Sequence, residues 1–320
     1  MQSKPFVVAL EEHYLDADLA TAFLGRQPDR QSEIEKRLLD VGALRLREMD
    51  EAGIDLQVLS HGAPAAQGLA PETAVRLARQ TNDRLHAIVQ ANPQRFAAFA
   101  ILPTPDPQAA ADELDYAVST LGFKGAMIHG LTHGVFIDDR RFWPIFERAE
   151  ALDVPLYMHP SFPNPVVIDA YYKDYADQYP ELIGPALGFT VETATQGVRL
   201  VLSGVFQKYP GLRIVMGHLG EGIPFLLWRI NESLSRPGNA ASLSFRDVFR
   251  KHFYLTTSGN FSDTALACAI AEMGADRILF SVDWPYIGNG LGTKWLSNAA
   301  LTETDRAAIF GGNAKTLLKL

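Results

Sequence analysis

Five of the eight histidines in this 320-residue chain lie where short apolar segments end. The first such place is 9-ALEEHYLD-16, directly after the apolar run 5-PFVVAL-10. Side chains of a strand alternate between its two faces, so Glu11 and His13 should point together to one face and Glu12 to the other. A buried carboxylate is costly unless it is paired or binds a metal. By itself, the stretch leaves two alternatives open, half of a metal site or only a polar loop start.

The same pattern recurs along the chain. The histidines that end an expected strand, or follow one closely, are His13, His61, His129, His159 and His218, and Asp283 ends the last expected strand. Neutral imidazoles and carboxylates are the usual ligands of zinc, manganese and iron(II), so a metal explains this clustering better than packing does. His86 and His252 are assigned to structure, and His133 to a loop.

The elements that must position these side chains alternate regularly. Apolar runs typical of parallel strands covered on both faces span residues 5–10, 54–59, 96–102, 125–129, 155–159, 212–218, 253–258 and 278–283. Helical patterns span residues 44–53, 72–91, 107–121, 140–152, 190–210, 223–235, 263–274 and 302–319. This repeat predicts an α/β fold, a (β/α)8 TIM barrel formed by residues 1–320 as one domain, whose functional groups lie at the C-terminal ends of the strands.

Two further features qualify this prediction. An open doubly wound sheet is the alternative, but such a sheet usually has a glycine-rich phosphate turn after its first strand, where this chain has Glu-Glu-His. The connection 161–188, after the fifth strand, is too long for a plain turn and rich in tyrosine. We expect an ordered lid or a subunit contact there.

The bulk composition excludes several classes of protein. A net charge of −8 and a pI near 5.5 argue against a nucleic-acid partner, because such binding needs clustered lysine and arginine. No apolar run approaches the length that spans a membrane, and no signal-peptide pattern begins the chain. The lone Cys268 fits a reducing compartment. These features predict a cytoplasmic protein with no membrane partner.

The longer motifs carry a family resemblance. The E-x-H pair, 158-MHP-160, 199-RLVLSGVFQKYPGLRIVMGHLGEGIPF-225 and 278-ILFSVDWPY-286 together resemble the amidohydrolase superfamily, over nearly the whole chain. Within it, the chain is most similar to the decarboxylase branch, which includes γ-resorcylate, 2,3-dihydroxybenzoate and 5-carboxyvanillate decarboxylases.

The resemblance implies one divalent metal, manganese or zinc, bound by Glu11, His13, His159 and Asp283. It also implies a hydrogen-bonded pair of His218 and Glu221 beside the metal. Two-metal hydrolases of the superfamily use H-x-H on the first strand and a carboxylated lysine that ends the fourth. This chain has Glu11 in the first place, and its Lys124 precedes the fourth strand. Where the decarboxylases tend to have a small polar residue, it reads 128-IHGLTHG-134.

The implied activity is non-oxidative decarboxylation of an ortho-hydroxy aromatic acid, with the metal chelating the carboxylate and the phenol oxygen. Asp283 is expected to protonate the ipso carbon, relayed or oriented through His218 and Glu221, and all three are the expected catalytic residues. The alternative is a metal-dependent hydrolase, a lactonase or amidase that uses metal-bound water. A non-catalytic scaffold is a third hypothesis, and it predicts no stoichiometric metal.

The expected substrate contacts are less specific. Arg229 and Arg45 are candidates to clamp a carboxylate, with surface salt bridges as the alternative, and Arg229 is expected to act from a neighbouring subunit of a homodimer or homotetramer. Candidates for the wall around the aromatic acid are Phe23, Tyr14 and Trp284, while His129 and His133 either contact substrate or cap their loop. Replacement of Glu12 by alanine is expected to be far milder than that of Glu11.

Overall fold

The computed structural model describes residues 5–29, 31–236, 238 and 244–320. Its strands are β1 (Val8–Tyr14), β2 (Leu56–His61), β3 (Phe96–Ala98), β4 (Ala100–Ile101), β5 (Ala126–His129), β6 (Leu156–His159), β7 (Ile214–Met216), β8 (Phe253–Thr256) and β9 (Ile278–Leu279). They pair in the orders β1-β2-β3 and β4-β5-β6-β7-β8-β9, and every pairing between them is parallel.

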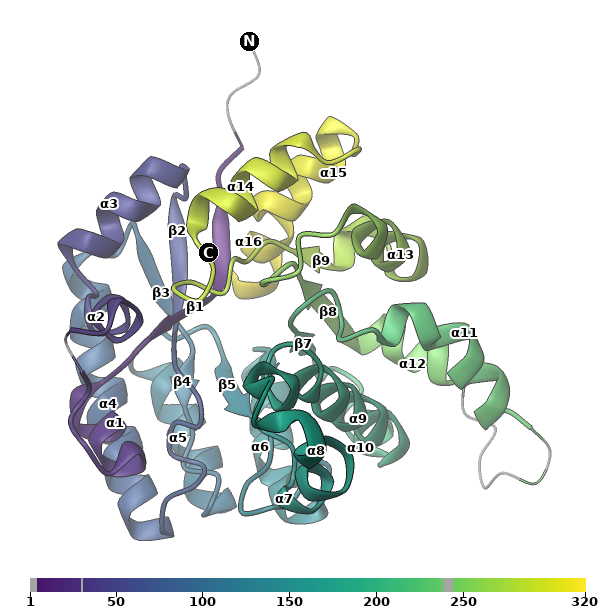
Figure 1. Cartoon of the computed structure of the whole chain (residues 1–320), viewed down its shortest axis with the longest axis horizontal. Coiled ribbons are helices and arrows are strands. Elements are labelled where there is room, and N and C mark those ends of the chain that lie inside the picture. The colour runs from purple at the N-terminus through teal and green to yellow at the C-terminus, as the bar shows by residue number, and fades with distance from the viewer. Residues whose placement is uncertain (1–4, 30, 237, 239–243) are drawn as a thin grey trace.

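Backbone hydrogen bonds join the two sheets into one barrel. Only Phe99 separates β3 from β4, and its N–H donates to the Leu59 carbonyl. On the other side, the chain after β9 lies along β1: the Asp283 N–H donates to the Glu11 carbonyl over 3.1 Å, and the His13 N–H donates to the Trp284 carbonyl over 2.7 Å. The predicted (β/α)8 barrel is therefore confirmed, with β1 beside the C-terminal part of the chain (Figure 1).

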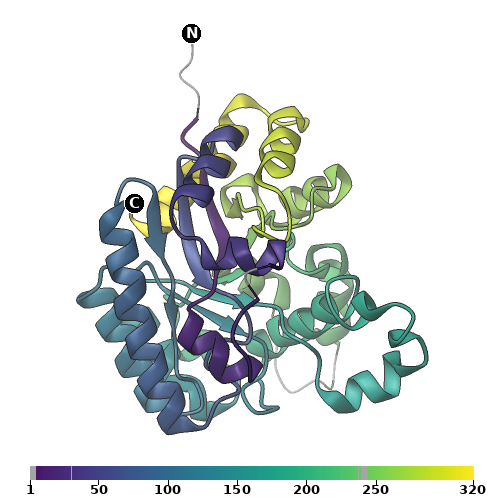
Figure 2. The same ribbon diagram turned by 60° about the vertical axis from the view of Figure 1, so that its left-hand side comes forward.

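Helices surround the strands on the outside (Figures 1 and 2). The α-helices are α1 (Ala17–Leu24), α2 (Glu33–Leu39), α3 (Ala43–Ala52), α4 (Pro71–Ala91), α5 (Pro107–Ser119), α6 (Trp143–Ala151), α7 (Pro165–Val167), α8 (Lys173–Ala176), α9 (Gly188–Leu202), α10 (Val205–Lys208), α11 (Ile223–Leu234), α12 (Phe245–His252), α13 (Asp263–Met273), α14 (Asn289–Asn298), α15 (Glu303–Ala307) and α16 (Asn313–Leu318). Short 3-10 and π segments are η1 (Arg140–Phe142), η2 (Ile168–Tyr172), η3 (Pro180–Ile183), η4 (Ala275–Arg277) and η5 (Ala308–Gly312).

Local signals explain where these helices begin and end. Asp106 caps α5 by accepting from the Ala109 N–H, directly before a proline that suits the first turn. Gly53 ends α3 in the left-handed conformation. Two predicted helices are interrupted: 190–210 breaks after Leu202, where Gly204 takes a φ of 88°, and 302–319 divides into α15, η5 and α16.

The connection 161–188 is ordered into the short segments α7, η2, α8 and η3 between β6 and α9. Of its four tyrosines, Tyr172 is buried, and Tyr171, Tyr175 and Tyr179 are exposed. This agrees with an ordered segment rather than a disordered loop. Among the described residues, no helix is long and apolar enough to cross a membrane.

A β-bulge in β1 changes which of its side chains face inward. Val8 and Leu10 belong to an apolar cluster that fills the lower barrel together with side chains of β2, β5, β6, β7, β9 and α16. Strict alternation from Leu10 would bring Glu12 inward. The pairing with β2 instead shifts between Ala9 and Glu12, so Glu11 and His13 face the interior above Leu10.

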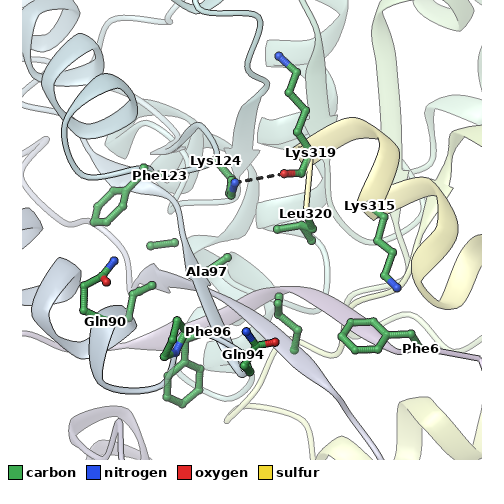
Figure 3. A pocket seen from close by; sticks show the side chains of 15 residues that line it. Phe6, Gln90, Gln94, Phe96, Ala97, Phe123, Lys124, Lys315, Lys319 and Leu320 are labelled. Atoms are coloured by element: carbon green, nitrogen blue, oxygen red, sulfur yellow. Dashed lines mark hydrogen bonds between the residues drawn. The ribbon is translucent and has the colours of Figure 1, made fainter.

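The opposite end of the barrel has a hollow of about 500 Å³, lined by Phe6, Phe96, Lys124, Lys315 and Lys319 among others (Figure 3). Lys124 donates there to the carbonyl of Lys319 over 3.3 Å. Lys124 thus lies at the N-terminal ends of the strands, away from the histidines. A two-metal site of this superfamily would need a carboxylated lysine near the histidines. Lys124 lies too far from them to serve, so its placement supports a site for one metal.

Candidate metal centre

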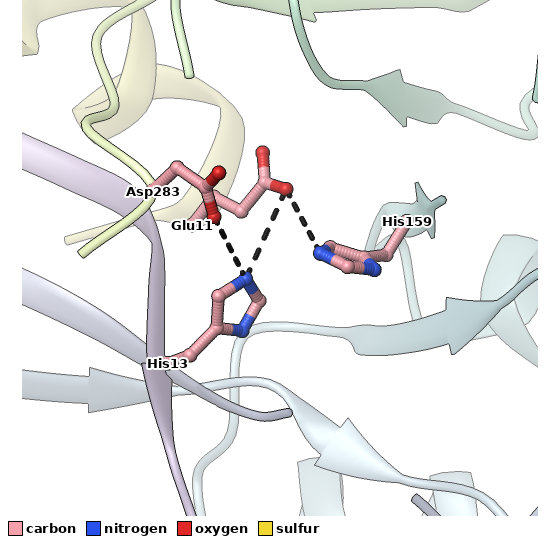
Figure 4. A group of neighbouring side chains, drawn as sticks. All are labelled: Glu11, His13, His159 and Asp283. Atoms are coloured by element: carbon pink, nitrogen blue, oxygen red, sulfur yellow. Dashed lines mark ion pairs between the residues drawn. The ribbon is translucent and has the colours of Figure 1, made fainter. Parts of the chain in front are cut away.

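The four predicted ligands come together at the C-terminal end of the barrel (Figure 4). Glu11 and His13 lie in β1, His159 ends β6, and Asp283 follows β9. One ligand atom from each lies within 4.8 Å of all the others. The His159 Nε2 is 3.1 Å from Glu11 Oε1, and the His13 Nε2 is 3.3 Å from Asp283 Oδ1. Within the described residues, this is the one such cluster of histidine, cysteine or acidic side chains.

The cluster fits a cation. Glu11 Oε1 and His13 Nε2 are buried and have no hydrogen-bond partner among the described residues, which is costly unless a ligand satisfies them. The His159 Nδ1 donates to the Pro160 carbonyl over 2.7 Å, so its Nε2 carries a lone pair toward Glu11. Two imidazoles with two carboxylates suit manganese or zinc.

Glu11 is held as an anion. Burial acts to raise its pKa, but the nearby histidine rings, His218 above all, outweigh burial and hold that pKa well below its usual range. Its second oxygen, Oε2, accepts a hydrogen bond from the hydroxyl of Tyr157. Burial and the Glu11 charge raise the pKa of Tyr157 well above its ordinary value, so the phenol keeps its proton. Tyr157 is a site residue that was not predicted from the sequence.

His218 and Glu221 form the predicted pair beside the cluster. The His218 Nδ1 is 2.7 Å from Glu221 Oε1, and its Nε2 is 3.9 Å from Asp283 Oδ2. Burial lowers the pKa of His218, but Glu221 and Glu11 reverse this effect and raise the pKa well above its ordinary value. Glu221 Oε2 accepts from the Thr190 hydroxyl over 2.8 Å. The pair is therefore placed to hold a proton next to Asp283.

Strained backbone aims these side chains. Residues 218–222 all have positive φ, between 52° and 83°, and Asp283 has a φ of 75°. Residues other than glycine adopt this region at a cost of about 1–3 kcal/mol each, and such strain gathers at functional sites. The turn brings Glu221 back under His218 within three residues.

Glu12 points away from the cluster, as predicted, but it is not a bystander. It is fully buried, and its Oε1 accepts from the Val282 N–H over 2.9 Å and from the Ser281 hydroxyl over 3.1 Å. Its Oε2 accepts from the Trp284 N–H over 3.3 Å. Glu12 therefore ties the segment that carries Asp283 to β1, so we expect a larger effect of its replacement than the sequence alone predicts.

Two predicted substrate residues lie behind β1 instead of in the barrel mouth. Arg45 is fully buried and donates to the carbonyls of His13 and Asp40, with its guanidinium 3.9 Å above the Trp284 ring. Trp284 is itself buried, and its indole N–H donates to Glu48. Because these groups are occupied within the protein, both residues support β1 from behind. The geometry thus gives Arg45 and Trp284 a supporting place behind β1 and not one in the mouth of the barrel.

His129 is the predicted substrate residue that reaches the cluster. Its ring centroid lies 4.7 Å from that of His159, and its Nδ1 is buried without a partner among the described residues. Burial lowers the pKa of His129 well below its ordinary value. His133, by contrast, is exposed, and its Nε2 lies 3.1 Å from the Leu69 carbonyl in the loop.

The remaining histidine at a strand end is structural. His61 Nε2 accepts the Asp16 N–H over 3.0 Å, and its Nδ1 donates to the Gly62 carbonyl over 2.8 Å. Burial lowers the pKa of His61 to about 4. The ring packs edge-on against Tyr14, at 5.3 Å, and Phe23, at 6.0 Å, so these two aromatics contact His61.

Arg229 lies on the outer face of α11. It is exposed and makes no hydrogen bond or ion pair within the described part of the chain. Tyr286, which was not among the predicted site residues, lies nearer the site, with its ring centroid 5.8 Å from that of His13.

The chain is similar to proteins of known activity over its full length. Residues 11–320 match the amidohydrolase family. A γ-resorcylate decarboxylase from Polaromonas sp. is 42% identical over 98% of both chains, and one from Rhizobium sp. is 40% identical over 100% of this chain and 99% of the relative. The crystal structure of a dihydroxybenzoic acid decarboxylase from Polaromonas sp., with bound manganese and the inhibitor 2-nitroresorcinol, has a TM-score of 0.90 and 40% identity over 99% of this chain and 98% of that one. That of a 5-carboxyvanillate decarboxylase from Sphingomonas paucimobilis has a TM-score of 0.91 and 32% identity over 99% and 100%.

Proposed function

The chain belongs to the amidohydrolase family, and from that premise we propose that it is a metal-dependent, non-oxidative decarboxylase of dihydroxybenzoate-type aromatic acids. The observation that carries the proposal is the cluster of Glu11, His13, His159 and Asp283 in a chain that is 42% identical, over its full length, to a γ-resorcylate decarboxylase. Manganese, which is bound in structures of relatives, fits the two carboxylates and two imidazoles.

When bound, the ion would bind the carboxylate and the neighbouring phenol oxygen of the acid, and its positive charge would stabilise both. Asp283, which is 18% exposed at the mouth, then protonates the ring carbon that carries the carboxylate. The bond from that carbon to the carboxylate breaks, its electron pair restores the aromatic ring, and CO2 leaves. His218, oriented by Glu221, returns a proton to Asp283.

The decisive assay compares two products. The manganese-loaded protein should release CO2 from 2,6-dihydroxybenzoate, while it releases no acid from lactones or amides. Asp283→Asn should lose this activity. A protein that hydrolyses lactones but releases no CO2 from a panel of ortho-hydroxybenzoates would instead be the metal-dependent hydrolase.

A second variant separates the acid–base pair from metal binding. Glu221→Gln keeps the size of the side chain but removes the charge that orients His218. It should retain one metal per chain and lose about 10–100-fold in kcat. Loss of the metal in this variant would place Glu221 among the groups that support the ligands.

We also propose a homodimer or homotetramer, in which Arg229 reaches the site of a neighbouring copy. The outer face of α11 exposes Phe225 by 82% and Trp228 by 65%, and an apolar groove beside it is lined by Val191 and Leu226 among others. Exposed apolar patches of this kind mark interaction sites. Light scattering gives the oligomeric state.

Mixing two inactive variants tests the role of Arg229. In a hybrid dimer of one Asp283→Asn chain and one Arg229→Ala chain, the Arg229→Ala chain keeps its own Asp283 and receives Arg229 from its neighbour, so its site is complete. The other site lacks both groups and is inactive. Random reassembly of dimers should then recover about a quarter of the full activity. No recovery in confirmed hybrids would contradict action across the interface.

A cytoplasmic location, which agrees with the lone Cys268, is also part of the proposal.

A further inference from the structure

Tyr157 supports the metal cluster from below. It lies in β6 two residues before His159, so both side chains face the barrel interior. The tyrosine is fully buried, and its ring lies 6.0 Å from that of Phe99. Its hydroxyl donates to Glu11 Oε2, and it is 2.8 Å from the Thr256 hydroxyl and 3.3 Å from that of Ser258.

The direction of these hydrogen bonds follows from the carboxylate. An ionised Glu11 only accepts, and a phenol has one proton to give. The Tyr157 hydroxyl therefore donates its hydrogen bond to Glu11, and the Thr256 hydroxyl donates to the phenol oxygen. Ser258 lies 2.8 Å from Thr256 and completes the chain of hydroxyls. The three groups thus hold one carboxylate oxygen in place.

The two oxygens of Glu11 have different surroundings. Oε2 is occupied by Tyr157, whereas Oε1 has no hydrogen-bond partner among the described residues and lies 3.1 Å from His159 Nε2. We propose that Tyr157 is a positioning residue that restricts Glu11 to offering a single oxygen to the metal ion.

This restriction matters for substrate binding. Carboxylates bind hard cations through one oxygen or through both, and a second oxygen would occupy a further position around an octahedral ion. An ortho-hydroxy acid that chelates the ion needs two positions. By holding Oε2 away, Tyr157 keeps room for both oxygens of the substrate. This part of the inference rests on the proposed decarboxylase function.

The test is Tyr157→Phe, which removes one hydroxyl and keeps the ring. The metal-free protein is reloaded with Mn2+ and examined by elemental analysis and by the relaxation of solvent-water protons at the bound ion. The variant should keep one metal per chain, but each ion should relax water less, because the second Glu11 oxygen displaces a water ligand. KM for 2,6-dihydroxybenzoate should rise about 10–100-fold, with a smaller change in kcat.

Thr256→Val is the matched control, since its hydroxyl contacts Tyr157 and not the carboxylate. It should change relaxation and KM less than Tyr157→Phe. Water relaxation per ion equal to that of the wild type would overturn the proposal, whether or not metal is lost. The relaxation readout needs no turnover, so a chain that decarboxylates nothing would still report on Tyr157.

Discussion

Replacing Glu12 with alanine should damage the metal centre, although the Glu12 side chain points away from it. The carboxyl group binds the Val282 N–H, the Trp284 N–H and the Ser281 hydroxyl, on both sides of Asp283. Truncation leaves these donors buried and unpaired. Burial lowers the pKa of Arg45 to about 9, and Glu12 opposes this more than any other acidic group, so truncation also removes support of the buried guanidinium. We expect the protein to lose stability and the Asp283 segment to lose its fixed position.

The magnitude follows from the number of donors. An unpaired buried donor costs about 1–3 kcal/mol, and a buried charge that loses its partner about 3–5 kcal/mol, part of which relaxation recovers. We therefore expect Glu12→Ala to lower the free energy of unfolding by about 3–5 kcal/mol. Glu12→Gln retains the volume and one carbonyl oxygen, so its loss should be about 1–2 kcal/mol.

The assay is urea unfolding of metal-free protein, followed by manganese titration. Glu11→Gln is the control, because its remaining oxygen can still accept from Tyr157 while the charge that binds the metal is gone. Glu11→Gln should bind metal weakly but unfold at about the wild-type urea concentration. Relative to the wild type, Glu12→Ala should lose both stability and metal affinity. The reasoning is refuted if Glu12→Ala unfolds within about 1 kcal/mol of the wild type and binds metal equally well.

Three further outcomes are expected. Burial acts to raise the pKa of Asp16, but hydrogen bonds from Arg84 outweigh burial and lower this pKa below its ordinary value of 3.8. The stability that the pair contributes is therefore present above pH 3.8 and is lost as the pH falls below that value. Asp16→Asn keeps a capping oxygen for α1 and should flatten the acid side of a stability–pH curve measured by thermal unfolding. Gly125→Ala would drive a methyl group into the Pro155 carbonyl at a φ of 137° and should cost about 2 kcal/mol or more in urea unfolding, whereas Gly122→Ala, with a φ of 76° and open space, should cost less. Removal of metal by a chelator should lower the Tm, and added manganese should restore it, because the ion relieves buried unpaired ligand atoms.

The barrel and the metal ligands could be predicted because their signals are local. Near-continuous apolar runs indicate parallel strands, and packing alone seldom places histidines or carboxylates at the ends of such strands. The roles of Glu12 and Arg45 depend on distant partners: the bond from Val282 to Glu12 joins residues 270 positions apart. Tyr157 was missed for a different reason. A tyrosine inside 155-PLYMH-159 is typical of ordinary core packing, and its pattern does not show where its hydroxyl points.

The bulge in β1 gives the strand two phases. Before it, Val8 and Leu10 follow the packing of the barrel floor, and after it, Glu11 and His13 follow the geometry of the ligands. Because the period of a strand is two, the same sequence paired with β2 without the bulge would continue the alternation from Leu10 and bring Glu12 inward in place of Glu11. The composition of the motif would not change, yet Glu12, which holds the Asp283 segment, and Glu11, which is in the ligand cluster, would exchange positions. The extra residue thus lets the apolar end of β1 and its metal-binding end each present the side chains that they need to the interior. Other apolar residues can therefore replace Val8 or Leu10 while Glu11 and His13 still face the site.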